Sequence, residues 1–187
     1  MAGGDLVVLP TDTVYGIGTR PDDPAATARL FQAKRLPRDL ELPVLVPTAA
    51  AAEGVCMVDE RARALMDALW PGPLTLVLPR AEDSRAWDLG GDPETVGVRR
   101  PRHLMALALL ELAGPLAVTS ANVSGRRTPA TCDELFEVFG REVQVYLCQE
   151  EPLAGQPSTV VDLAGSEPRL LREGPVSEAQ IRAVIGG

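Results

Sequence analysis

The stretch LAVTSANVSG, residues 116–125, joins a hydrophobic run to a polar turn. The aliphatic residues Leu116 to Val118 predict a buried strand, and the helical stretch His103 to Leu112 precedes it. Thr119 to Gly125 then follows the strand with hydroxyl, amide and glycine residues. Ligands commonly bind where a strand of an α/β sheet ends, but an ordinary capped turn has the same composition, so both interpretations stay open.

Strand-like and helix-like patterns alternate along the rest of the chain. The predicted strands are Leu6 to Leu9, Val44 to Val46, Leu74 to Leu78, Val96 to Val98, Leu116 to Val118, Val143 to Leu147 and Thr159 to Leu163. The predicted helices are Asp23 to Lys34, Asp59 to Trp70, His103 to Leu112, Asp133 to Phe139 and a last one capped by Ser177 with Gln180. Because segregated elements would give a block of strands and then a block of helices, this alternation predicts an α/β fold with a mixed sheet. We expect residues 1–187 to form a single domain.

The composition is that of an ordinary globular protein. The chain has 187 residues, of which 45% are hydrophobic and 24% charged, so it can bury one sizeable core. No run approaches the ~18 apolar residues of a membrane span, and the start lacks the basic and apolar regions of a signal peptide. We therefore expect a cytoplasmic protein with no membrane partner.

The formal charge of -8 indicates that the surface as a whole repels nucleic acid. A polyanion would have to meet a local cluster of positive groups. Two Trp, two Tyr and three Phe leave little material for a stacking platform, so a small substrate is favoured over a single-stranded nucleic acid.

The three cysteines, Cys56, Cys132 and Cys148, are widely spaced and form no CxxC pair. This pattern indicates neither a disulfide framework nor a zinc site. We expect reduced and mostly buried thiols.

Three further segments combine polar residues with glycine or with strand-like residues. The first is PTDTVYGIG, residues 10–18. Its hydroxyl, carboxylate and glycine residues suit either a loop that binds a ligand or a turn whose side chains hydrogen-bond to its own backbone. Gly16 and Gly18 lack the third glycine of a dinucleotide fingerprint, and the chain has no Walker loop, so any ATP is held in another way. The other two segments, Ser158 to Asp162 and Leu171 to Gly174, are weak signals alone.

Together these strings resemble the YrdC/Sua5 family. They occur in family order as PTDTVYGIG, a helix ending at a lysine with a basic tail, WPGPLT, VGVRRPRH, TSANVSG, STVVD and LREG, and they cover nearly the whole chain. The resemblance implies a twisted mixed sheet flanked by helices around a deep, positively charged cleft.

It also implies a reaction. Members condense L-threonine, bicarbonate and ATP, which carries Mg²⁺, into threonylcarbamoyl-AMP and pyrophosphate, and downstream transferase proteins use the product to modify tRNA. Threonine and bicarbonate give a carbamate whose oxygen attacks the α-phosphorus, so the protein chiefly aligns the reactants and neutralises charge. A Ser-His-Asp hydrolase is disfavoured, because the single histidine shows no sign of a carboxylate partner.

The resemblance assigns roles to individual residues. The positions that match L-threonine contacts are Thr13, His103, Ser120 and Ser158. The positions that match ATP contacts are Lys34, Arg99, Asn122 and Arg172. Lys34 and Arg99 would act by electrostatic alignment, with no covalent or acid–base residue and no metal ligand in the protein. Asp12 would be a second-layer partner.

The chain departs from the family pattern after its first predicted helix. Leu36 stands where many members have an arginine that reaches ATP, and we expect Arg38, in preference to Arg35, to supply that charge. A family histidine is also missing from the stretch Pro43 to Pro47. The first predicted strand begins only a few residues from the start, where the family usually has an additional helix. Because no second domain follows, we expect the short form of the family.

Two other functions stay open. The chain could be a non-catalytic module that holds a nucleotide, tRNA or double-stranded RNA in the same basic cleft, with turnover lost through the change at Leu36. A carbamoyl-transfer domain is the other alternative, although such domains usually belong to much longer chains.

Overall fold

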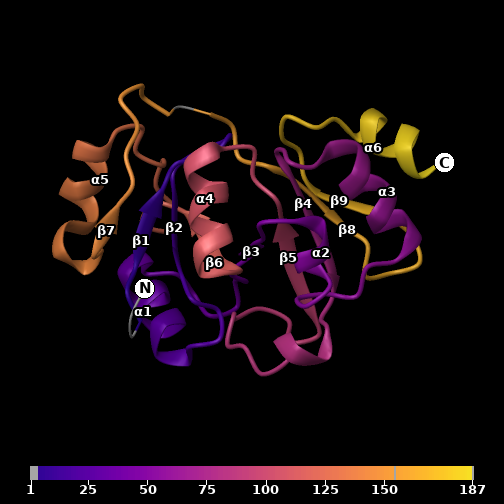
Figure 1. The fold of residues 1–187 in the computed structure, drawn as a ribbon, viewed down its shortest axis with the longest axis horizontal. Coiled ribbons are helices and arrows are strands. Elements are labelled where there is room, and N and C mark those ends of the chain that lie inside the picture. Colours follow the sequence, from indigo (N-terminus) through magenta and orange to yellow (C-terminus); the bar gives the residue numbers. More distant parts are fainter. Residues whose placement is uncertain (1–3, 154, 187) are drawn as a thin grey trace.

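The structure, a computed structural model, describes residues 4–153 and 155–186. In this part of the chain, six helices flank one nine-stranded mixed sheet, which confirms the predicted fold class (Figure 1). The strands are β1 Val7–Leu9, β2 Gly16–Thr19, β3 Val44–Leu45, β4 Leu74–Pro79, β5 Thr95–Arg99, β6 Leu116–Ser120, β7 Val145–Tyr146, β8 Thr159–Asp162 and β9 Arg169–Arg172. The helices are α1 Pro24–Lys34, α2 Ala49–Ala52, α3 Glu60–Leu69, α4 Leu104–Ala113, α5 Cys132–Phe139 and α6 Glu178–Ile185.

The strand order brings distant polar segments together. The order is β7-β1-β2-β6-β3-β5-β4-β8-β9, so β2 pairs with β6 although about a hundred residues separate them. In that antiparallel pair Gly16 lies opposite Ser120. The segment before β2 and the turn after β6 therefore meet at one end of the sheet.

Two helices begin at the capping residues that the sequence predicts. The Asp23 side chain accepts hydrogen bonds from the first amides of α1, and Ser177 forms a capping box with Gln180 at α6. Helix α1 ends at Arg35, whose φ of 51° is left-handed. This sharp end turns the next residue, Leu36, back against the core.

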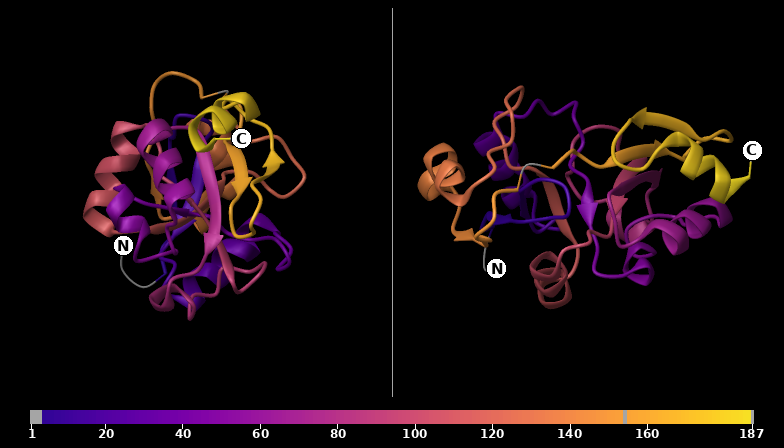
Figure 2. Two further views of the ribbon diagram at one scale, coloured as in Figure 1. Left: turned by 90° about the vertical axis from the view of Figure 1, so that its right-hand side faces the viewer. Right: turned by 90° about the horizontal axis from the view of Figure 1, so that it is seen from above.

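Buried aliphatic residues fill both sides of the sheet. Helix α4 covers one face through Ala106 and Leu110, which pack with Val7 and Leu116. The larger cluster lies with α1, α3 and α6 and contains Leu30, among others. Seen from above in Figure 2, α5 (orange) lies at one end of the long axis of the molecule and α6 (yellow) at the other. None of the described helices is long and apolar enough to cross a membrane.

Strands β2 and β9 were not predicted. Strand β2 contains Gly16 and Gly18, where a Cβ atom would lie 2.6 Å and 2.5 Å from methyl groups of Val118. Glycine is therefore required by the close approach of β6, and it removes the alternating side chains that reveal a strand. Strand β9 lies at the sheet edge with all its residues exposed, so it too lacks an alternating pattern.

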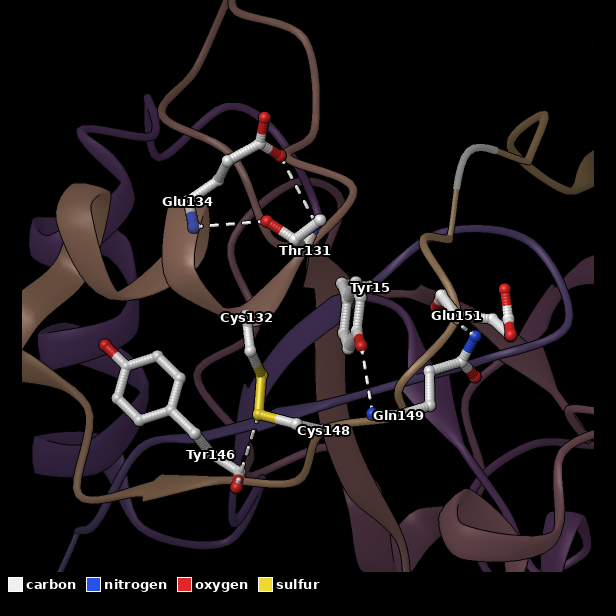
Figure 3. The surroundings of a disulfide bond; sticks show 8 residues. All are labelled: Tyr15, Thr131, Cys132, Glu134, Tyr146, Cys148, Gln149 and Glu151. Atoms are coloured by element: carbon white, nitrogen blue, oxygen red, sulfur yellow. Dashed lines mark hydrogen bonds between the residues drawn. A yellow bond between two sulfur atoms is a disulfide. The ribbon is translucent and has the colours of Figure 1, made fainter.

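The prediction of reduced cysteines was wrong for two of the three. Cys132 and Cys148 form a disulfide with a Cα–Cα distance of 5.8 Å (Figure 3). Only Cys56 matches the prediction, as a buried free thiol. The chain folds back after α5, so that Tyr146 of β7 packs against Phe136 and Cys148 lies beside Cys132. The separation of 16 residues between the two cysteines does not by itself predict this contact.

Candidate functional site

A cavity of about 760 Å³ opens where the polar segments meet. Residues from β2, β3, β4, β5, β6, β8 and β9 line it, together with the segments around Thr13 and Ser158. Its volume is within the range of small-molecule sites. Six of the predicted site residues line this one cavity, namely Thr13, Arg99, Ser120, Asn122, Ser158 and Arg172.

Arg99 is the buried centre of the site. Its side chain is 7% exposed, and its three donor groups bind Gly72 O at 3.0 Å, Thr13 Oγ1 at 3.0 Å and Asp12 Oδ1 at 2.5 Å. Burial lowers the pKa of Arg99, and the Asp12 carboxylate opposes that shift. Asp12 also accepts from the Arg102 amide. The guanidinium is therefore locked in one orientation beside the Thr13 hydroxyl.

A second group of hydrogen bonds holds Ser158 on the opposite wall. Its hydroxyl lies 2.8 Å from Thr75 Oγ1 and accepts from Arg172 Nη2 at 3.1 Å, while Arg172 Nε donates to Ser158 O at 2.9 Å. A Cβ on Gly174 would lie 2.4 Å from the amide nitrogen of Thr159, so only glycine lets the segment after β9 approach this closely. Partial burial lowers the pKa of Arg172.

The turn after β6 is fixed from below by Lys34. This residue is 1% exposed, and its Nζ donates to the carbonyl oxygens of Ser120 and Asn122. Burial lowers its pKa to about 8. The Ser120 hydroxyl donates to the Asn122 side chain, which in turn donates to Arg126 O at 2.9 Å. Lys34 thus supports the turn from beneath and does not line the cavity.

Two of the arginines that line the cavity were not predicted from the sequence. Arg126 and Arg127 follow TSANVSG directly and project from the turn that Asn122 organises. With Arg99 and Arg172 they give the described lining four arginines against one acidic residue, Glu41. The pair of adjacent arginines after a predicted ligand-binding turn was the available signal. The cavity is therefore positive in a chain whose formal charge is -8.

His103 and Arg38 lie outside the cavity lining. His103 Nε2 is 3.0 Å from Gln149 Oε1, and its Nδ1 is buried with no partner among the described residues. Arg38 lies at the surface, where it pairs with Asp88 at 2.9 Å and stacks 4.2 Å over the Phe31 ring. The ligand contacts assigned to the predicted site residues stay predictions.

Glu41 makes the stability of the protein depend on pH. It lines the cavity, accepts from Gly97 N at 2.8 Å, and burial raises its pKa to about 7, partly offset by that bond and by Arg80. Between pH 4.5 and about 7 the folded state keeps a proton that the unfolded state loses, so stability falls as pH rises. We expect Glu41→Gln to be more stable than the wild type by about 2 to 3 kcal/mol at pH 8, with the difference vanishing near pH 4.5.

Urea unfolding of both proteins at several pH values measures this difference. The exposed Glu82 provides the control variant Glu82→Gln, whose difference from the wild type should stay small throughout. A gain at Glu41→Gln that is the same at every pH would contradict the assignment.

Comparison with known proteins places this chain in a family. The Sua5–YciO–YrdC family model, with the description "Telomere recombination", matches residues 1–174. A Mycobacterium tuberculosis protein, provisionally named threonylcarbamoyl-AMP synthase, is 45% identical over 184 residues, covering 98% of this chain and 84% of its own. The threonylcarbamoyl-AMP synthase of Pyrococcus abyssi is 40% identical over 185 residues.

A solved structure agrees with the sequence relatives. Pyrococcus abyssi Sua5 complexed with L-threonine superposes with a TM-score of 0.88 at 37% identity, over 98% of this chain and 54% of that one. The chain thus spans about half the length of the Pyrococcus abyssi protein.

Proposed function

Because this chain belongs to the Sua5/YciO/YrdC family, we propose that it is a threonylcarbamoyl-AMP synthase, a nucleotidyltransferase that acts on L-threonine, bicarbonate and ATP. One observation carries the proposal. Residues that match L-threonine contacts and residues that match ATP contacts line the same cavity, from both walls. The named relatives at 45% and 40% identity support the same reaction.

The cavity suits an amino acid at its hydroxyl-lined part. Thr13 and Ser158 are buried, and each hydroxyl is held by an arginine, Arg99 or Arg172. Fixed hydroxyls of this kind can recognise the polar groups of L-threonine without reorganising. His103 lies outside the cavity lining, with its Nε2 bonded to Gln149, so a contact with the same ligand would require its side chain to move.

The lining arginines suit the polyphosphate. The reaction first joins the threonine amine to bicarbonate, with loss of water, and the carbamate oxygen then attacks the α-phosphorus as pyrophosphate leaves. Arg99, Arg126, Arg127 and Arg172 can neutralise the anions that meet there. Because three bonds already hold Arg99, its charge is oriented before the substrates arrive.

Mg²⁺ enters this proposal with ATP. The described residues contain no group of three or more His, Cys, Asp or Glu side chains that could hold a metal ion. In the proposed reaction the phosphate oxygens of ATP carry the ion, which is the usual way that proteins bind Mg²⁺ together with a nucleotide. The reaction also implies a cytoplasmic enzyme whose product passes to a tRNA-modifying transferase.

A non-catalytic module that binds a nucleotide, tRNA or double-stranded RNA is the competing function, since the same four arginines could hold phosphates without turnover. Pyrophosphate release from ATP separates the two functions. A synthase releases pyrophosphate only when L-threonine and bicarbonate are both present, whereas a module releases none. Release that is independent of L-threonine would contradict the proposed substrate.

Because Leu36 replaces an arginine of the family pattern, another residue has to contact the ATP phosphates. We compare Arg126 and Arg38 in this role. Leu36 packs against the core, and the predicted substitute Arg38 would have to leave Asp88 to reach ATP. Arg126 already lines the cavity. We expect Arg126→Ala to raise the KM for ATP by about tenfold or more, as for a lost charged hydrogen bond, and Arg38→Ala to raise it less than threefold. The reverse order would assign the phosphate role to Arg38.

A further inference from the structure

The disulfide between Cys132 and Cys148 ties together two segments that both line the cavity. Arg126, Arg127, Thr128 and Ala130 lie just before Cys132. Leu153, Gly155, Pro157 and Ser158 lie after Cys148, on the stretch that crosses the molecule to β8. Nothing in the proposed reaction uses this bond.

The stretch after Cys148 contacts the side of the site predicted to bind L-threonine. In Figure 3, Gln149 lies next to the disulfide and its backbone amide donates to the Tyr15 hydroxyl at 3.2 Å. The Gln149 side chain holds His103 at 3.0 Å. Further along, a Cβ on Gly155 would lie 1.8 Å from Thr13 O, so the backbone there presses directly on Thr13.

Beyond these contacts the stretch is anchored mainly by Leu153, which packs against the core. Glu150, Glu151 and Pro152 are exposed, as are residues 155–157. Leu153 N donates to Ala130 O at 2.8 Å, but Ala130 itself is held by the turn that leads to Cys132. The covalent link is therefore the firmest attachment between the described part of this stretch and α5.

We propose that Cys132–Cys148 is a site of reversible thiol–disulfide exchange that sets how firmly the described residues 149–153 and 155–158 cover the cavity. The stretch is held in place while the disulfide is intact, and it loosens when the two thiols form.

The local chemistry suits such an exchange. Cys148 is exposed, so the thiolate of a small thiol can attack its sulfur and release Cys132. A second molecule of the small thiol then resolves the mixed disulfide, which leaves two protein thiols and one small-molecule disulfide. Cys132 is the first residue of α5, where the peptide dipoles stabilise a leaving thiolate.

Loosening the stretch should weaken L-threonine binding. Without the tether, Gln149 no longer fixes His103, and Gly155 no longer holds Thr13 in place. This consequence rests on the proposed function, because it takes L-threonine as the ligand of Thr13 and His103.

The test uses the full chain in two states, one oxidised with glutathione disulfide and one reduced with dithiothreitol, with the bond verified by mass spectrometry. We expect amide hydrogen exchange of the described residues between Gln149 and Ser158 to be about tenfold faster after reduction, and L-threonine affinity by calorimetry to fall by about tenfold, as for one lost hydrogen bond. Reoxidation should restore both. Cys148→Ser should match the reduced protein in either solution, which provides a matched control.

The two measurements separate this inference from the proposed function. Equal rates of amide hydrogen exchange in the two verified states would contradict the proposed role of the disulfide. A failure of the Cys132–Cys148 bond to form with glutathione disulfide would contradict it as well. If amide hydrogen exchange becomes faster on reduction but L-threonine binds in neither state, the role of the disulfide is supported and the proposed function is contradicted.

Discussion

Replacing Arg99 with methionine is expected to reduce the free energy of unfolding by about 3 to 5 kcal/mol, because the Asp12 carboxylate would stay buried without its partner. The Asp12 side chain is 12% exposed, and its second oxygen already lacks a partner among the described residues. Water therefore cannot replace the guanidinium fully. Urea unfolding measures the loss directly.

The double variant Arg99→Met/Asp12→Asn separates folding from activity. Removing both charges leaves no unpaired buried ion, so we expect most of the lost stability to return. Activity should stay at least ~100-fold below the wild type, because the cavity lacks its best-oriented positive group. A double variant that is both stable and fully active would show that Arg99 serves only the fold.

Replacing Lys34 with methionine is expected to lower kcat/KM by ~100-fold or more. The substitution removes the donor to the carbonyl oxygens of Ser120 and Asn122, and each unpaired buried carbonyl costs about 1 to 3 kcal/mol. The turn that carries Ser120, Asn122 and the two arginines after it would lose its support. Steady-state kinetics measure the loss, and the exposed Gln32 on the same helix provides the control Gln32→Met.

The charge of Lys34 can also be followed directly, because it is the only lysine in the chain. Burial lowers its pKa from 10.5 to about 8, so between these values the folded state has lost a proton that the unfolded state keeps. The contribution of Lys34 to stability therefore rises with pH over that range, while the positive charge beneath the turn is lost. Protein labelled with ¹⁵N-lysine would give a single side-chain signal that titrates near pH 8, and a midpoint near 10.5 would show that the amine is not buried.

The sequence predicted most of the fold because local signals agree with it. Asp23 before Pro24 and the Ser177–Gln180 pair mark helix starts that the structure confirms. Strand β2 was not predicted, because its glycines are required by the close contact with Val118. That contact depends on a strand about a hundred residues away in the sequence. Long-range packing, and not local preference, determines that element.

The candidate site was predictable where polar residues lie next to strands in a known order, as at Thr13, Ser120 and Ser158. What the residues alone did not reveal depends on three-dimensional contacts. Glu41 has a raised pKa because the fold buries it against Gly97, and Cys148 meets Cys132 because the chain folds back after α5, where Tyr146 packs against Phe136. The side chain of Lys34 likewise points beneath the turn and not into the cavity.

The fate of isotopic carbon tests the proposed synthase most directly. The protein is incubated with ATP, L-threonine and ¹³C-bicarbonate, and the products are identified by mass spectrometry. The proposed function predicts an AMP adduct that contains both threonine and the labelled carbon, formed together with an equal amount of pyrophosphate. If ATP and L-threonine bind in the cavity but no labelled adenylate forms, the chain is a binding module and not a synthase.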